Sequence, residues 1–113
     1  MATSRREKDL RSLGLSASNA TTMHREMVEV ERTGSTRAAD AVLDDANRLL
    51  EGHGIEAING KWHDRYYQDI VALYVNMGDT YNGTILYDTV KRKFHVTTWG
   101  DFVETKTRAY DIA

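Results

Sequence analysis

Cysteine and proline are both absent from this chain, and no aromatic residue precedes Trp62. The lack of cysteine excludes disulfides, thiolate zinc sites, iron–sulfur clusters and a cysteine nucleophile, and it fits a reducing cytosol. No apolar run approaches the ~18 residues that a membrane-spanning helix needs. The first 15 residues also lack the apolar segment that is typical of a secretory signal. We therefore expect a cytoplasmic protein with no membrane partner.

Charge of either sign is not in large excess. The 15 lysines and arginines nearly balance the 17 aspartates and glutamates, which leaves a formal net charge of −2. This balance disfavours a strongly basic nucleic-acid-binding protein and a strongly acidic DNA mimic, but it leaves local patches open. The length of 113 residues predicts a single domain over 1–113. Within it, residues 1–34 are either docked on the rest or a loosely attached helical arm that orders on a partner.

Two helices are predicted in the first 34 residues. Ser4 and Glu7 have the spacing of a capping box, in which the serine hydroxyl accepts a hydrogen bond from the backbone amide three residues later. A second helix is predicted over 21–32, with Thr21 or Thr22 as its N-cap.

The strongest helical pattern covers 36–51, with Thr36 as the predicted N-cap and glycines directly after it. Apolar residues recur along this stretch at the helical spacing of three and four: Ala39, Val42, Leu43, Ala46, Leu49 and Leu50. The pattern predicts an amphipathic helix whose apolar face packs on a sheet.

The second half of the chain is β-prone, because all six tyrosines, both tryptophans and both phenylalanines lie there. Alternation predicts strands near 69–77, 84–88 and 94–99, and a short strand with a turn at Asn59-Gly60. The predicted connections are a loop over 78–83 and a hairpin turn over 89–93. Residues 102–108 are predicted as either a short helix or an edge strand. Such short connections imply antiparallel pairing. The predicted fold class is α+β, with N-terminal helices before an antiparallel meander of three to four strands and the 36–51 helix on the sheet.

Catalytic motifs are scarce. The pair His63-Asp64 resembles a metal or acid–base motif most closely, but His53 and His63 do not have a standard ligand spacing. Neither a Gly-x-Ser-x-Gly elbow nor a glycine-rich phosphate loop after a strand is found. We therefore assign no catalytic residue, metal or cofactor, and keep an enzyme that uses His63, Asp64 or His95 as a third hypothesis.

One dense basic cluster lies in the β-prone half, at Lys91, Arg92 and Lys93. With neighbouring aromatics it could bind a nucleic acid, the lysines meeting phosphate and the rings stacking on bases. Charged residues at a hairpin tip also keep the tip solvated and protect a sheet edge from pairing, and we favour this explanation. A small nucleic-acid-binding regulatory protein is the alternative function.

The remaining aromatic residues and the acids of the 36–51 helix are the candidates for binding a protein partner. Aromatic side chains are enriched at the cores of protein interfaces. The candidate aromatic residues are Tyr66, Tyr67, Tyr74, Tyr81 and Trp99. The candidate acids, which could mimic an acidic ligand, are Asp40, Asp44, Asp45 and Glu51. Coverage of the aromatic sheet face by the chain's own helices is an equally good explanation of the aromatic set.

The segments YYQDIVALYVNMGDTY (66–81), TILYD (84–88) and FHVTTWGD (94–101) resemble small accessory proteins that phages and other mobile elements encode. The resemblance covers about residues 49–104 and includes no catalytic motif. It implies a protein that acts in the host cytoplasm by inhibiting a defence complex such as CRISPR–Cas, as an anti-CRISPR protein does. We therefore expect a non-enzymatic module that binds a host protein or complex, by steric occlusion or mimicry, and that is compatible with homodimerisation.

Overall fold

The computed structural model of the chain describes residues 4–52, 56–61, 70–77, 80–100 and 103–109. Within the strands, the side chains described are those of Leu73, Val75 and residues 83–88 and 93–98. Three helices and then five strands occupy the described residues: α1 (Arg5–Ser12), α2 (Ala17–Thr33), α3 (Thr36–Gly52), β1 (Glu56–Lys61), β2 (Ile70–Met77), β3 (Thr80–Asp88), β4 (Lys93–Gly100) and β5 (Val103–Ala109).

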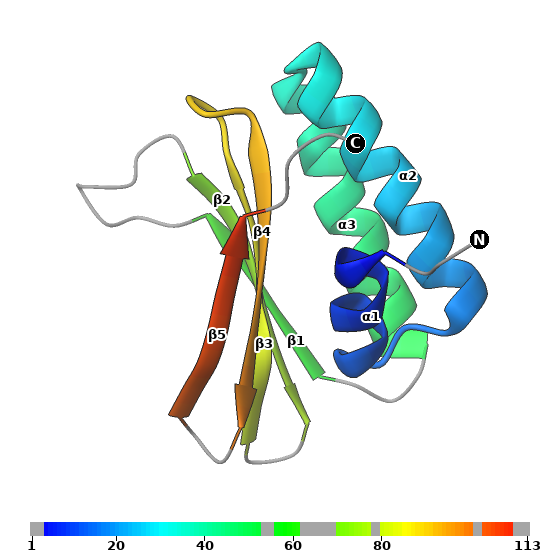
Figure 1. Cartoon of the computed structure of the whole chain (residues 1–113), viewed down its shortest axis with the longest axis vertical. Coiled ribbons are helices and arrows are strands. Elements are labelled where there is room, and N and C mark those ends of the chain that lie inside the picture. Colours follow the sequence, from blue (N-terminus) through cyan, green and yellow to red (C-terminus); the bar gives the residue numbers. More distant parts are fainter. Residues whose placement is uncertain (1–3, 53–55, 62–69, 78–79, 101–102, 110–113) are drawn as a thin grey trace.

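The strands form one antiparallel sheet in which each strand pairs with the next along the chain, in the order β1-β2-β3-β4-β5 (Figure 1). The fold is α+β, with helices before an antiparallel sheet, as predicted. The predicted number of three to four strands is not confirmed. The additional pairing comes from the segment 103–109, which extends the sheet at its edge, the second of the two alternatives for that region.

One predicted turn and the last part of one predicted loop lie inside strands. Asn59 and Gly60 are paired within β1 with Leu73 and Ala72, so the predicted turn at Asn59-Gly60 is wrong. The predicted loop over 78–83 is too long, because β3 already begins at Thr80. Glycine and asparagine favour turns locally, but pairing with a neighbouring strand outweighs that preference here.

Serine side chains mark the starts of the helices. The Ser4 hydroxyl accepts a hydrogen bond from the Glu7 amide at 3.1 Å, which confirms the predicted cap of α1. Ser16 caps α2 in the same way, so the predicted threonine cap is wrong and the helix begins earlier, at Ala17. Ser35 accepts from the Ala38 amide at 3.2 Å, and this bond makes Ser35 rather than Thr36 the cap of α3. Each serine lies three residues before the amide that it satisfies, which is the geometry a cap requires.

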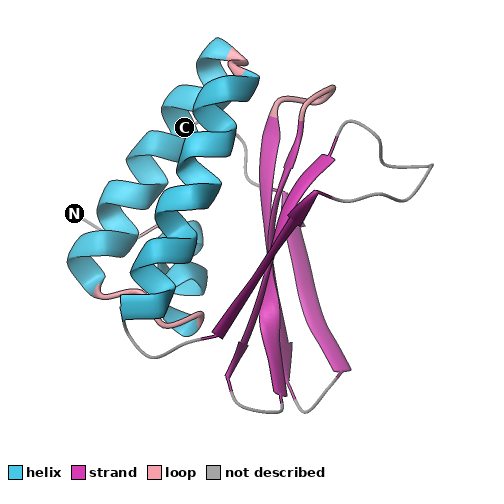
Figure 2. Cartoon of the chain, turned by 180° about the vertical axis from the view of Figure 1, so that it is seen from behind, coloured by secondary structure: helices cyan, strands magenta, loops and turns pink. Residues whose placement is uncertain are grey.

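All three helices lie on one face of the sheet (Figure 1, Figure 2). Helix α3 contacts β1, β2 and β3, whereas α1 and α2 contact β4. The described core combines apolar side chains of the helices and of the sheet: Leu10, Leu13, Leu15, Ala20, Met23, Met27, Val30, Ala39, Val42, Leu43, Ala46, Leu50, Leu73, Val75, Ile85, Tyr87, Phe94 and Val96. The core therefore includes both helices of the segment 1–34.

A buried ion pair joins the helix layer to the sheet. The guanidinium of Arg6 on α1 donates to both carboxylate oxygens of Glu31 on α2, at 2.7 and 3.0 Å, and both side chains are fully buried. The carboxylate of Glu31 also accepts a hydrogen bond from the backbone amide of Phe94 at the start of β4, at 3.1 Å. One carboxylate thus connects three elements that are far apart in the sequence.

Replacing Arg6 with alanine should lower the free energy of unfolding by about 3–5 kcal/mol, because Glu31 would keep a buried charge without its cation. Urea unfolding followed by circular dichroism measures the difference. Arg5→Ala is the matched control, since Arg5 is exposed on the same helix, and it should change the free energy by less than about 0.5 kcal/mol. Equal effects of the two substitutions would show that the buried pair does not hold the helix layer.

Tyr87 lies under the helices with its ring 4.6 Å from that of Phe94, measured between the ring centroids. Burial raises the pKa of the Tyr87 phenol. Its hydroxyl is buried and has no hydrogen-bond partner in the described part of the chain. An unsatisfied buried hydroxyl opposes folding, because it loses its bonds to water without replacement.

Tyr87→Phe should therefore leave the free energy of unfolding unchanged or raise it by about 1 kcal/mol. The same urea titration measures the change. A clear loss of stability would mean that the hydroxyl has a partner, and the expectation would then be wrong.

Candidate functional site

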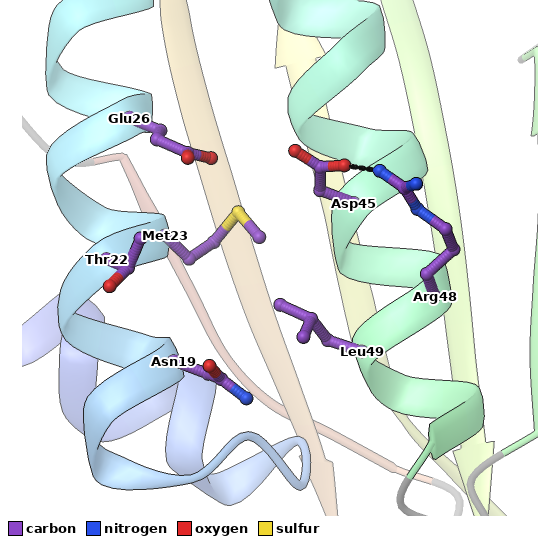
Figure 3. A pocket seen from close by; sticks show the side chains of 7 residues that line it. All are labelled: Asn19, Thr22, Met23, Glu26, Asp45, Arg48 and Leu49. Carbon is purple, nitrogen blue, oxygen red and sulfur yellow. Dashed lines mark ion pairs between the residues drawn. The ribbon is translucent and has the colours of Figure 1, made fainter.

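A groove runs between α2 and α3 on the side of the helices that faces away from the sheet (Figure 3). Its first depression has a volume of 260 Å³ and is lined from both helices by Asn19, Thr22, Met23, Glu26, Asp45, Arg48 and Leu49. A second depression of 300 Å³ is lined mainly by apolar residues: Glu26, Glu29, Val30, Ala38, Ala41, Val42 and Asp45. Glu26 and Asp45 line both depressions, so they mark the middle of one continuous groove.

The acids of the groove differ in whether they are paired. Asp45 forms an ion pair with Arg48, and Glu29 forms one with Arg32, each within one exposed turn of a helix. Exposed pairs of this kind contribute at most about 1 kcal/mol, because water screens them. Glu26 has no ion pair with any described residue and is only partly exposed. Among the described residues, the carboxylate of Glu26 at the centre of the groove therefore has no cation paired with it.

The structure brings one of the four predicted acids, Asp45, to the groove. Asp45 lines both depressions, and Asp44 lines a further hollow of 450 Å³ on the outer side of α3. Asp40 and Glu51 are exposed on α3 but do not line these hollows. Glu26 was not among the predicted acids, because an acid on α2 gains significance only when the pairing of α2 with α3 is known.

The predicted aromatic residues are located only in part. Tyr66 and Tyr67 lie outside the described residues. The backbones of Tyr74, Tyr81 and Trp99 belong to β2, β3 and β4, and their side chains lie outside the described part. Their role in binding stays a prediction.

The face of the sheet opposite the helices has no helix on it in the described part of the chain (Figure 2). Leu86 and His95 pair with each other across β3 and β4, and their neighbours along each strand belong to the core under the helices. Side chains alternate between faces along a strand, so Leu86 and His95 belong to the opposite face. Both are partly buried, and burial lowers the pKa of His95.

The basic hairpin tip is held by the protein's own groups. The Asp88 carboxylate accepts hydrogen bonds from the amides of Val90 and Lys91, each at 3.0 Å. Arg92 has a left-handed backbone, and a Cβ built on Gly34 would lie 2.6 Å from its Nε atom, so its side chain lies against the C-terminal cap of α2. A cation is favoured there by the helix dipole. Arg92 thus contacts the fold, but Lys91 and Arg92 are both exposed, and the nucleic-acid interpretation of Lys91, Arg92 and Lys93 stays a prediction.

A polar cluster lies where α1 meets α2. Burial alone would raise the pKa of Glu7, but hydrogen bonds from Thr21 and Ser4 outweigh it and hold the pKa below its ordinary value. Burial, with the Arg6 guanidinium nearby, lowers the pKa of His24. The Nδ1 atom of His24 is buried without a hydrogen-bond partner among the described residues.

The catalytic candidates do not come together in the described part of the molecule. His53, His63 and Asp64 lie outside the described residues. Among the residues that are described, no three histidine, aspartate or glutamate side chains are arranged to hold a metal ion. None of the described helices is both long enough and apolar enough to cross a membrane.

No protein-family model, curated protein or solved structure matches this chain. The site must therefore be interpreted from its own geometry.

The free energy of unfolding should fall as the pH drops below about 6.5, where a solvated histidine takes up a proton. His24 resists protonation in the folded protein, so the unfolded chain binds more protons and acid favours it. His24→Gln should make this decline shallower, as measured by urea titrations at several pH values. An unchanged slope in the variant would mean that His24 does not contribute to acid sensitivity.

Proposed function

We propose that this protein is a non-enzymatic binding module that inhibits a host defence complex, such as a CRISPR–Cas effector, on behalf of a phage or mobile element. The observation that carries the proposal is the acidic groove between α2 and α3, centred on Glu26 and Asp45. Effectors that handle nucleic acids hold them in positively charged channels. Acids presented by a rigid helical layer can face such a channel and exclude the nucleic acid.

Two further features support this proposal. The helix layer is fixed to the sheet by the buried Arg6–Glu31 pair, so the groove is presented by a preorganised scaffold. Preorganisation reduces the entropy lost on binding. The resemblance of residues 49–104 to accessory proteins of mobile elements is the reason for proposing a phage or mobile element as the source and a host defence complex as the target. The aromatic set Tyr66, Tyr67, Tyr74, Tyr81 and Trp99 is proposed as a second contact region.

The proposal can be tested by phage infection of cells that carry an active CRISPR–Cas or restriction system. Expression of the protein should restore plaque formation on cells with at least one such system. A double variant, Glu26→Lys and Asp45→Lys, should lose this effect, because reversing the charge replaces attraction with repulsion. Asp40→Lys, an exposed acid outside the groove, is the matched control and should retain the effect.

Purified effector complexes should also bind the protein directly and lose nucleic-acid binding in its presence. Failure to restore plaques against a panel of defence systems, together with no binding to their complexes, would refute the proposal. Direct, steeply salt-dependent binding of the protein itself to DNA or RNA, lost in Lys91→Glu, would support the alternative instead.

A further inference from the structure

We infer that the groove between α2 and α3 receives one basic amphipathic helix from the partner protein. An arginine or lysine of that helix lies between Glu26 and Asp45, and an apolar side chain enters the depression on either side. The inference rests on the proposed binding function and adds to it the kind of segment that the site recognises.

The spacing of the two depressions favours a helix. On α2 the first depression contains Met23 and the second contains Val30, and on α3 they contain Leu49 and Val42. Met23 and Val30 are seven residues apart, as are Val42 and Leu49, and seven residues of helix span about 10.5 Å at 1.5 Å per residue. A bound helix that runs along the groove has the same rise, so its residues i and i+7 can enter both depressions from one face.

An extended peptide fits this spacing poorly. About 10.5 Å corresponds to three residues of a strand, and residues three apart in a strand point to opposite faces. An extended segment could therefore fill one depression but not both with neighbouring anchors. The geometry selects a helical segment with apolar residues at i and i+7.

The charge at the centre specifies the residue between those anchors. The carboxylates of Glu26 and Asp45 point toward one another across the groove (Figure 3). Among the described residues, Glu26 has no ion pair and Asp45 pairs with Arg48, whose side chain is 74% exposed. A cation at i+3 or i+4 of the bound helix would lie midway between the anchors and meet both acids. Arginine suits this position better than lysine, because its planar group can donate to two carboxylates at once.

The lining limits how deep the contact can be. Met23, Val30 and Val42 are almost fully buried, whereas Leu49 and Ala38 are partly exposed and Ala41 is exposed. The buried residues at the bottom of the groove are already packed in the core. The partner's apolar side chains therefore contact mainly Leu49, Ala38 and Ala41. Recognition depends on the central charge as much as on apolar burial.

A synthetic peptide of about 20 residues, long enough to hold a helix, provides the probe. It carries leucine at i and i+7 and arginine at i+4, on an alanine and glutamine background. A control peptide of the same composition has the arginine on the opposite face. Fluorescence anisotropy measures the binding of both peptides to the full-length protein at low and at moderate salt.

The first peptide should bind more tightly than the control, and its affinity should fall as salt is added. Glu26→Lys should weaken binding by at least about tenfold, because like charges then oppose each other. Leu49→Asp should weaken it as well, whereas the exposed acids Asp40→Lys and Glu51→Lys should change it by less than about threefold. Thermal unfolding of each variant establishes that it is folded.

The outcomes separate the inference from the proposed function. Equal binding of the two peptides, or no effect of Glu26→Lys, overturns the helix-in-groove inference even if the protein still inhibits a defence complex. Peptide binding that depends on Glu26, without inhibition of any defence system, supports the groove and refutes the proposed function. Self-association in sedimentation experiments that Glu26→Lys abolishes would make a second copy the occupant, and it would overturn the assignment to a partner protein.

Discussion

The carboxylate of Glu31 is the point at which the helix layer and the sheet are held together. It accepts two hydrogen bonds from Arg6 and one from the Phe94 amide, and all of these groups are buried. Such a pair contributes little relative to a well-packed apolar pair, since both charges lose their water. Removal of one partner is nevertheless costly. Its main physical effect is therefore orientation, because α1 and β4 must both lie where their groups can donate to the same carboxylate of α2.

The location of the groove follows from that arrangement. With the Arg6–Glu31 pair fixing α1 and α2 over β4, and α3 packed over β1, β2 and β3, the three helices share one face of the sheet (Figure 1). The buried sides of α2 and α3 provide the core, and the two helices meet along an outward groove where polar residues stand beside the edge of that core. Glu26 and Asp45 reach its centre for this reason. The core residues Met23, Val30 and Val42 also line the groove, so stability and the proposed binding depend on the same two helices.

Local patterns predicted much of the architecture, and long-range contacts account for what they missed. The apolar spacing from Ala39 to Leu50 predicted α3, because a helical repeat depends only on residues that are close together in the sequence. The Arg6–Glu31 pair could not be predicted, because a buried charge looks like a surface charge until its partner, 25 residues away, is known. Of the two acids at the centre of the groove, Asp45 on α3 was among the predicted binding residues, whereas the position of Glu26 on α2 depends on how the two helices pair.

The central claim is that Glu31 fixes the helix layer on the sheet, and hydrogen exchange at the Phe94 amide tests it most directly. This amide donates to Glu31, so in the native protein it should exchange only through global unfolding. In Glu31→Ala, the exchange rate of the Phe94 amide should rise by a larger factor than the rates of neighbouring amides in β4, which report the general loss of stability. If the protection of the Phe94 amide relative to those neighbours were the same in the variant as in the native protein, the account would be contradicted.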